Sequence, residues 1–201
     1  MKSEVVFYPV WLRAWHWLNA VLFLLMIISG ISMHYSSNGS LLLSFKTSVF
    51  IHNICGITVS IIYLLFFIFN IFSKNIRYYF PRPKGIIKRL IKQSKYYLQG
   101  IFNKEPHPYE QTNEDKFNPL QQITYLFIMY GFMPVIIITG LLLIFPELAP
   151  DKAFGMGGIM PVAILHSSAA FFLTIFMAGH IYLATTGRTV LSNFKDMISG
   201  N

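Results

Sequence analysis

The sequence predicts an all-α integral membrane protein built as a four-helix bundle, and three observations support this fold class. Hydrophobic residues make up 54% of the chain and charged residues only 12%, far from the average of soluble globular proteins. Four apolar stretches are each long enough to cross the hydrocarbon core of a bilayer. Basic residues are concentrated in alternate connections between those stretches. Because backbone in lipid must satisfy its own hydrogen bonds, each stretch is expected to be a helix.

The expected spans cover residues 14–33, 48–72, 119–145 and 161–185. The first lies close to the N-terminus, but its apolar run is too long for a signal peptide and no small-residue cleavage site follows Met33. We therefore expect it to remain a helix. The chain has room for one membrane domain, residues 1–201, with a long loop at residues 73–118, and no second catalytic domain is expected.

The distribution of basic residues predicts the topology. Of the 16 Lys and Arg residues, only Lys46 and Lys152 lie in the two short connections; the others precede the first span, occupy the long loop or follow the last span. The positive-inside rule then places both termini and the long loop in the cytoplasm. Topology also accounts for the formal net charge of +8, so no nucleic-acid partner is expected.

The long loop contains a basic amphipathic segment at residues 84–102, in which apolar pairs recur about one helical turn apart. This pattern predicts a helix that lies on the inner membrane surface, where it would contact membrane lipid. A docking face for a cytoplasmic partner is the alternative interpretation.

Four histidines are expected inside the spans, at two matched depths. His16 and His180 lie near the inner ends of the first and fourth spans, and His52 and His166 lie near the outer ends of the second and fourth. His166 and His180 are fourteen residues apart, so they share a helix face to within about 40° and are separated by about 21 Å. Ionisable residues inside a membrane are costly and usually functional.

Histidine pairs at two depths predict two bis-histidine haem sites, with His16 and His180 binding an inner haem iron and His52 and His166 an outer one. Such sites leave no open position on the metal, which suits electron transfer. Four separate polar groups, hydrogen-bonded in the bundle interior, are the alternative. Cys55 is the single cysteine, so covalent attachment of a c-type haem through a Cys-x-x-Cys-His motif is excluded.

The remaining two histidines are expected to lie outside these sites. His34 is eighteen residues beyond His16 and shares its helix face, which makes it a rival ligand. However, it lies about 27 Å along the helix and is followed by a polar turn, so exposure to water is expected. His107 is expected on the surface of the long loop.

Three further residues are candidates for contact with haem. Gly30 is fourteen residues beyond His16, at the depth of the outer pair, where its missing side chain could admit a porphyrin. Packing between helices would equally favour a small residue there. Arg13 and Arg188 flank the inner site and could pair with haem propionates, although topology alone would explain both.

The first and third spans share a short motif near their outer ends. Ile28-Ser29-Gly30-Ile31 resembles Ile138-Thr139-Gly140-Leu141, and each is followed by a connection and then a span with a histidine near its start. The similarity is consistent with an ancient duplication, or with the general preference for small residues at helix contacts in membranes.

Essentially the whole chain resembles the di-haem cytochrome b subunits of bacterial membrane-bound nickel-iron hydrogenase, formate dehydrogenase-N and thiosulfate reductase, a cytochrome b561-like family. The segments that carry the resemblance are Arg13-Ala14-Trp15-His16-Trp17-Leu18-Asn19, His52, Lys116-Phe117-Asn118, Thr139-Gly140 with Pro146, and the pair His166 and His180. The resemblance implies a four-helix bundle in the bacterial inner membrane, with two b haems ligated as the depth argument pairs them.

The resemblance also implies a site for menaquinone or ubiquinone near the inner haem. Asn118 corresponds to the family's polar residue at the quinone pocket, and His180 borders it. Gln121 and Gln122 are weaker candidates. Asn118 followed by Pro119 is also a favourable start for a helix, so its role could be structural.

The leading functional hypothesis is a respiratory electron-transfer subunit that links a periplasmic redox partner to the membrane quinone pool. The partner would be an iron-sulfur, hydrogenase-like, molybdenum or multihaem cytochrome subunit, because this chain has no iron-sulfur motif. No catalytic residue is expected beyond the quinone site. The alternative is a stand-alone di-haem cytochrome b561 that oxidises quinol and reduces oxygen or superoxide. A non-redox scaffold would require the histidines to be coincidental.

Overall fold

The computed structural model describes residues 8–36, 42–73, 75–109, 117–153, 155–187 and 189–200. Within these ranges, four helical segments are long and apolar enough to cross a membrane. They are α1 (Val10–His34), α2 (Phe45–Phe72), the run Pro119–Ile144 and α6 (Ile159–Ala184). Their bounds lie within four residues of the predicted spans, and the predicted helical membrane bundle is confirmed.

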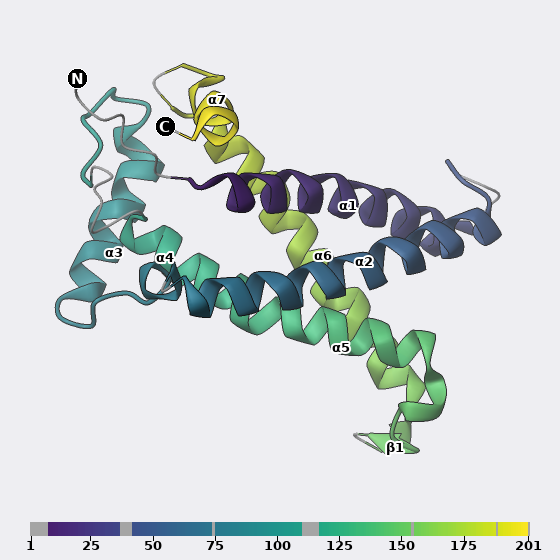
Figure 1. Cartoon of the computed structure of the whole chain (residues 1–201). Coiled ribbons are helices and arrows are strands. Elements are labelled where there is room, and N and C mark those ends of the chain that lie inside the picture. The colour runs from purple at the N-terminus through teal and green to yellow at the C-terminus, as the bar shows by residue number, and fades with distance from the viewer. Residues whose placement is uncertain are drawn as a thin grey trace.

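The four segments are arranged as two antiparallel hairpins, α1 with α2 and the run Pro119–Ile144 with α6. Figure 1 shows α3 (Ile86–Lys95), α7 (Ser192–Ser199) and the start of α1 at one end of the bundle, which we call the terminal end. A small antiparallel ribbon, β1 (Lys152–Ala153) with β2 (Met156–Gly157), lies at the opposite end, which we call the hairpin end. Single turns cover Asn75–Tyr78 and Pro146–Leu148.

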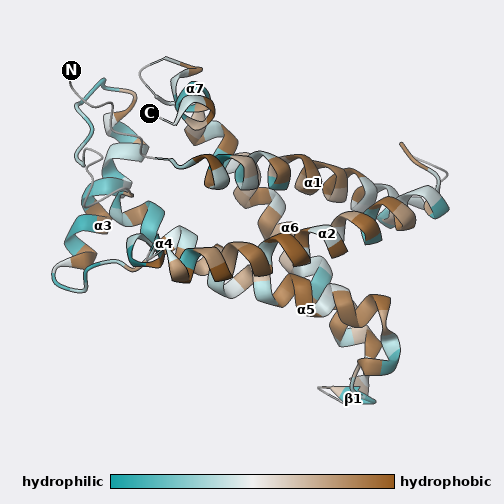
Figure 2. Cartoon of the chain, in the orientation of Figure 1, coloured by the Kyte–Doolittle hydropathy of each residue, from teal (hydrophilic) through white to brown (hydrophobic). Residues whose placement is uncertain are grey.

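Apolar residues follow the spans, whereas hydrophilic residues gather at the terminal end (Figure 2). There α3 continues as the π-helical turn Tyr96–Gly100 and lies across the ends of the spans (Figure 1). The predicted amphipathic helix in the long loop is therefore present. A side-chain cap marks the start of the second span: the Ser44 side chain caps α2 by accepting a hydrogen bond from the Thr47 backbone N–H at 3.2 Å.

The third span is interrupted by a π-helical turn. It consists of α4 (Pro119–Phe127), the turn Ile128–Phe132 and α5 (Met133–Ile144). Pro134 lacks an N–H and its ring crowds the preceding turn, which the wider π geometry accommodates. The Tyr63 hydroxyl donates a 2.6 Å hydrogen bond to the Met129 carbonyl, an acceptor that Pro134 cannot serve. The prediction of one plain helix missed this turn, although Pro134 was its visible signal.

The bundle has two apolar clusters, and in the described residues neither contains a side chain from α6. The first, near mid-bundle, is centred on Leu22, Cys55, Val59 and Met133. The second, toward the terminal end, is centred on Leu12, Phe66 and Tyr79. Helix α6 instead packs against α5. These two clusters therefore join the hairpin of α1 and α2 to α4 and α5 by apolar packing. Neither cluster joins α6 to α1 or α2 in the described residues.

The C-terminal helix is fixed to the start of α1. The Arg13 guanidinium donates a hydrogen bond to the Ile198 carbonyl, and the Trp17 indole N–H donates one to the Met197 carbonyl at 3.4 Å. The Tyr8 backbone N–H donates to the Gly200 carbonyl at 3.3 Å. Helix α7 thus closes the terminal end beside α1, a feature that the sequence analysis did not predict.

We predict that Phe66→Ala destabilises the bundle by about 3 kcal/mol, because it removes a side chain that is 2% exposed and stacks on Trp15 with ring centroids 4.3 Å apart. Phe72→Ala is the matched control, since Phe72 is 82% exposed on the same helix. Unfolding in mixed detergent micelles, followed by circular dichroism, measures both. Equal effects of the two substitutions would contradict the assigned core.

Candidate functional site

The four histidines of the spans lie in two facing pairs. The ring centroids of His16 on α1 and His180 on α6 are 6.0 Å apart, toward the terminal end. Those of His52 on α2 and His166 on α6 are 6.2 Å apart, toward the hairpin end. The structure therefore brings together the same partners that the depth argument predicted, and α6 supplies one member of each pair.

Both separations match two imidazoles bound to opposite sides of one metal atom. Bonds from a metal to histidine nitrogen are about 2.0 to 2.1 Å long. A ring nitrogen lies about 1.2 Å from its ring centre, given ring bonds of about 1.3 to 1.4 Å. Two rings across a shared metal then have centroids about 6.5 Å apart. The donor set and the spacing both fit bis-histidine ligation of a haem iron.

His52, one member of the pair toward the hairpin end, is oriented by hydrogen bonds with helix α1. The Nδ1 atom of His52 lies 3.1 Å from the Met26 carbonyl oxygen and 3.1 Å from the Ser29 hydroxyl. Because a carbonyl can only accept, Nδ1 carries the proton, and the Ser29 hydroxyl donates its own proton to the Leu25 carbonyl at 2.7 Å. Nε2 of His52 is thereby left without a proton and able to bind a metal.

His166 is held in the same way by α5. Its Nδ1 atom lies 3.0 Å from the Thr139 hydroxyl, which donates to the Val135 carbonyl at 2.7 Å, and the Ile136 backbone also contacts the ring. Thr139 and Ile136 occupy the positions in their hairpin that Ser29 and Met26 occupy in the other. The shared sequence motif therefore marks a repeated contact, and the sequence analysis missed the role of its Ser and Thr as histidine partners.

The glycine of each motif lies against the histidine ring. A Cβ at Gly30 would lie 3.5 Å from Cε1 of His52, and a Cβ at Gly140 would lie 3.1 Å from Cε1 of His166. Gly30 was expected to admit a porphyrin; in the structure its open side faces the imidazole, and contact with a porphyrin stays a prediction. The site at Gly140 is the tighter of the two.

The pair toward the terminal end lacks this type of support. Nδ1 of His16 is buried and has no hydrogen-bond partner in the part of the chain that the structure describes. Aromatic rings hold the two imidazoles instead: Trp17 lies edge-on to His16 at 5.3 Å, and Phe176 stacks on His180 at 6.1 Å. The two histidine pairs therefore have different surroundings. Hydrogen bonds orient the rings at the hairpin end, and aromatic contacts hold them at the terminal end.

The predicted propionate partners are only partly described. Arg13 lies near this pair in sequence, and while its guanidinium binds the Ile198 carbonyl, its buried Nε has no partner among the described residues. One donor therefore remains for an anionic group. Arg188 lies outside the described residues.

Asn118 is fully engaged as a helix cap. Its side-chain oxygen accepts hydrogen bonds from the backbone N–H groups of Leu120 and Gln121, at 3.1 and 2.9 Å. The Gln121 side-chain oxygen in turn accepts one from the Asn118 backbone N–H at 3.0 Å. Its amide donates to the Tyr97 hydroxyl at 3.0 Å. Burial raises the pKa of Tyr97, which keeps the phenol protonated at neutral pH. The capping role is thus observed, and the quinone role stays a prediction.

The other histidines and glutamines lie elsewhere. His34 is exposed at the end of α1 beside Tyr35, and His107 packs against Tyr96 in the long loop, with ring centroids 4.8 Å apart. The Gln122 side chain donates to the Tyr78 carbonyl at 3.2 Å. In the described structure neither histidine faces a second imidazole, as the sequence analysis expected.

Two comparisons relate the chain to known proteins. The profile of the family described as "Prokaryotic cytochrome b561" matches residues 7–200. The chain is 37% identical over 198 residues to the protein named "Putative cytochrome YdhU" from Escherichia coli (strain K12). That match covers 98% of this chain and 74% of the Escherichia coli protein. Family membership over this range implies binding of haem b.

We predict that Gly140→Ala lowers haem content or shifts the haem spectrum, because the new methyl group would press on the His166 ring at 3.1 Å. Gly30→Ala is the matched control, since 3.5 Å to His52 is an ordinary contact. A pyridine haemochrome assay and reduced-minus-oxidised spectra of the purified proteins measure the difference. If Gly30→Ala proves the more harmful, the described packing around the rings is wrong.

Proposed function

The chain belongs to the prokaryotic cytochrome b561 family, and from this premise we propose that it is a two-haem electron-transfer subunit of a quinone-linked respiratory complex. As a family member it is a multi-pass membrane cytochrome that binds haem b and transfers electrons. The proposal adds the number of haems, their ligands, the quinone and the partner.

The histidine geometry is the observation that carries the proposal. Two imidazole pairs, 6.0 and 6.2 Å apart, sit toward opposite ends of one bundle. Their shared helix α6 is continuous from Ile159 to Ala184, so His166 and His180 are separated by about 21 Å along the helix axis. Two sites at these depths would bridge most of a hydrocarbon core of about 30 Å.

His16 with His180 and His52 with His166 would each hold one haem b. When bound, each haem supplies one-electron chemistry, the iron alternating between the ferric and ferrous states. Two histidines per iron leave no open position for a substrate molecule, which favours electron transfer over chemistry on a bound ligand. The hydrogen bonds to Nδ1 of His52 and His166 would fix those rings and increase their basicity as ligands.

The same topology supports a role between two compartments. Ten of the Lys and Arg residues that the structure describes lie at the terminal end or in its connections, whereas Lys46 and Lys152 lie at the hairpin end. The positive-inside rule would then place the terminal end on the cytoplasmic side of a bacterial inner membrane. His52 and His166 would face a periplasmic redox subunit, and His16 and His180 a site for menaquinone or ubiquinone.

We predict that His180→Ala halves the haem-to-protein ratio, because one of the two haems would lose a histidine that holds it. His34→Ala is the matched control, since His34 is exposed and should leave both haems in place. The pyridine haemochrome assay, normalised to protein by amino-acid analysis, gives the ratio. Retention of full haem in His180→Ala would reassign the ligands, and absence of b-type absorbance from wild-type protein would end the proposal.

A second prediction separates the two roles of Asn118. Asn118→Ser keeps a good capping side chain and loses the amide that donates to Tyr97, whereas Asn118→Ala loses both. If Asn118 binds quinone, both variants should slow haem reduction by a soluble menaquinol analogue, roughly fivefold for one lost hydrogen bond. Asn118→Ala should also lose the cap, and with it about 1 kcal/mol more stability than Asn118→Ser.

Stopped-flow absorbance of the haem, under anaerobic conditions, measures the reduction rate. A wild-type rate in Asn118→Ser would restrict Asn118 to capping. Sustained oxygen consumption with quinol by the isolated chain would instead favour the stand-alone oxidase, and co-purification of redox subunits in mild detergent would favour the complex.

A further inference from the structure

The long loop presents a surface that is separate from the two histidine pairs. It is formed by α3 and the π-helical turn that follows it. One face of this segment is fixed to the bundle. Gln93 is completely buried, and the Tyr97 hydroxyl accepts the hydrogen bond from Asn118 at the start of α4. Because this face is held by the protein, the direction of the remaining faces is determined.

A neighbouring face is apolar and exposed. Ile87 and Ile91 are four residues apart, within about 40° of one another on the helix, and are 71% and 64% exposed. Leu98 and Phe102 continue the stripe and are 74% and 69% exposed. A contiguous apolar stripe of this kind on a helix outside the spans marks an interaction surface.

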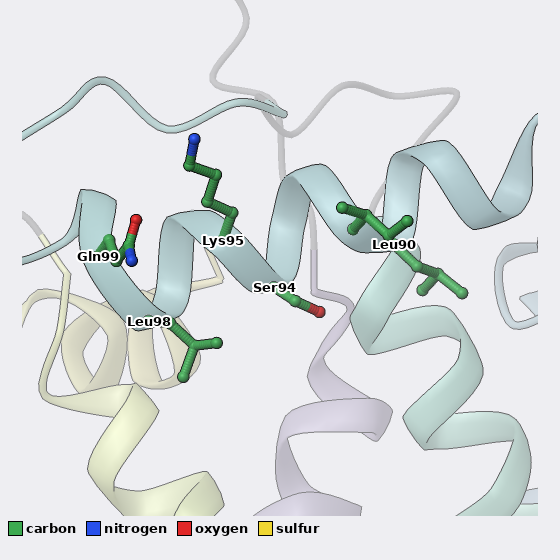
Figure 3. A pocket seen from close by; sticks show the side chains of 6 residues that line it. Leu90, Ser94, Lys95, Leu98 and Gln99 are labelled. Atoms are coloured by element: carbon green, nitrogen blue, oxygen red, sulfur yellow. The ribbon is translucent and has the colours of Figure 1, made fainter.

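The stripe borders a groove of about 350 Å³. Figure 3 shows Leu90, Ser94 and Leu98 pointing from the helix toward the side on which the spans lie, while Lys95 points the opposite way. The groove is lined by Leu90, Ile91, Ser94, Lys95, Leu98 and Gln99. The apolar wall of the groove therefore faces the side of the spans, and Lys95 faces away from them.

The third face is basic. Lys88, Lys92 and Lys95 lie about 80–140° around the helix from Ile87, next to the apolar stripe. Lys92 packs over the Tyr109 ring at 5.5 Å, whereas Lys88 and Lys95 are exposed and form no ion pair with a described carboxylate. Their charges remain available for an external anion.

We propose that α3 and the turn Tyr96–Gly100 form a binding site for an anionic phospholipid of the bilayer that the spans cross. Its acyl chains would lie along the groove at Leu90 and Leu98, and its phosphate would pair with Lys88 and Lys95. A cytoplasmic protein would have to reach an apolar wall that faces the membrane, so charge and direction together favour lipid. The site is independent of haem ligation.

The first test is lipid selectivity of the purified holoprotein. Native mass spectrometry in detergent, with equal amounts of phosphatidylglycerol and phosphatidylcholine of the same acyl chains, should show an excess of the anionic lipid on wild-type protein. Lys88→Gln with Lys95→Gln should reduce that excess, roughly fivefold for each lysine. Lys152→Gln with Lys195→Gln is the matched control, because both are exposed lysines elsewhere, and should retain it.

Equal binding of the two lipids by wild-type protein, or equal losses in both double variants, would overturn the proposal. Haem content is recorded in each sample, so that a misfolded variant is recognised and a failure of this proposal is separated from a failure of the proposed function.

The second test locates the apolar face. Leu98→Trp in proteoliposomes should be quenched by phosphatidylglycerol with brominated acyl chains, beyond the quenching of the native tryptophans measured in wild-type protein. Quenching by acrylamide alone would place residue 98 in water. That result would overturn the lipid proposal and favour a soluble partner for this surface.

Discussion

The separation of the two imidazoles in each pair is the constraint on which the rest of this bundle depends. With ring centroids 6.0 and 6.2 Å apart, the two imidazoles of each pair leave the spacing that one shared metal atom needs, so α6 is kept at a fixed distance from α1 and α2. Apolar side chains that filled this space would close it. The absence of α6 side chains from both described apolar clusters is consistent with that requirement, because α6 gains its packing from α5 instead.

A buried imidazole is stabilised by a partner for its second nitrogen, since lipid offers none. At the hairpin end the two halves of the protein meet this requirement identically, with a hydroxyl that bonds its own helix carbonyl and accepts from the ring. At the terminal end the rings rest on Trp17 and Phe176. Haem potential responds to hydrogen bonding and solvent exposure, so this asymmetry gives the two sites different electronic surroundings.

The sequence allowed the spans, their order and the histidine pairing to be predicted, because hydropathy and helix periodicity act over long stretches and depend little on tertiary detail. It did not reveal the hydroxyl partners, since Ser29 and Thr139 could equally have been packing residues. Nor did it reveal the docking of α7 on Arg13 and Trp17, because carbonyl acceptors carry no signature in side-chain sequence. Asn118 was ambiguous for a related reason: an amide uses the same atoms to cap a helix, as it does here, as it would to bind a ligand.

The π-helical turn before Pro134 has a consequence for comparison among relatives. A π turn holds one residue more than an α turn closed over the same height, so the extra residue is absorbed locally and the faces on either side keep their directions. Asn118 at one end and Thr139 at the other can therefore face their partners in homologues of different length. Alignment of a relative with an uninterrupted helix then calls for a one-residue gap within 128–132, without which every position of α5 is compared with a residue about 100° around the helix.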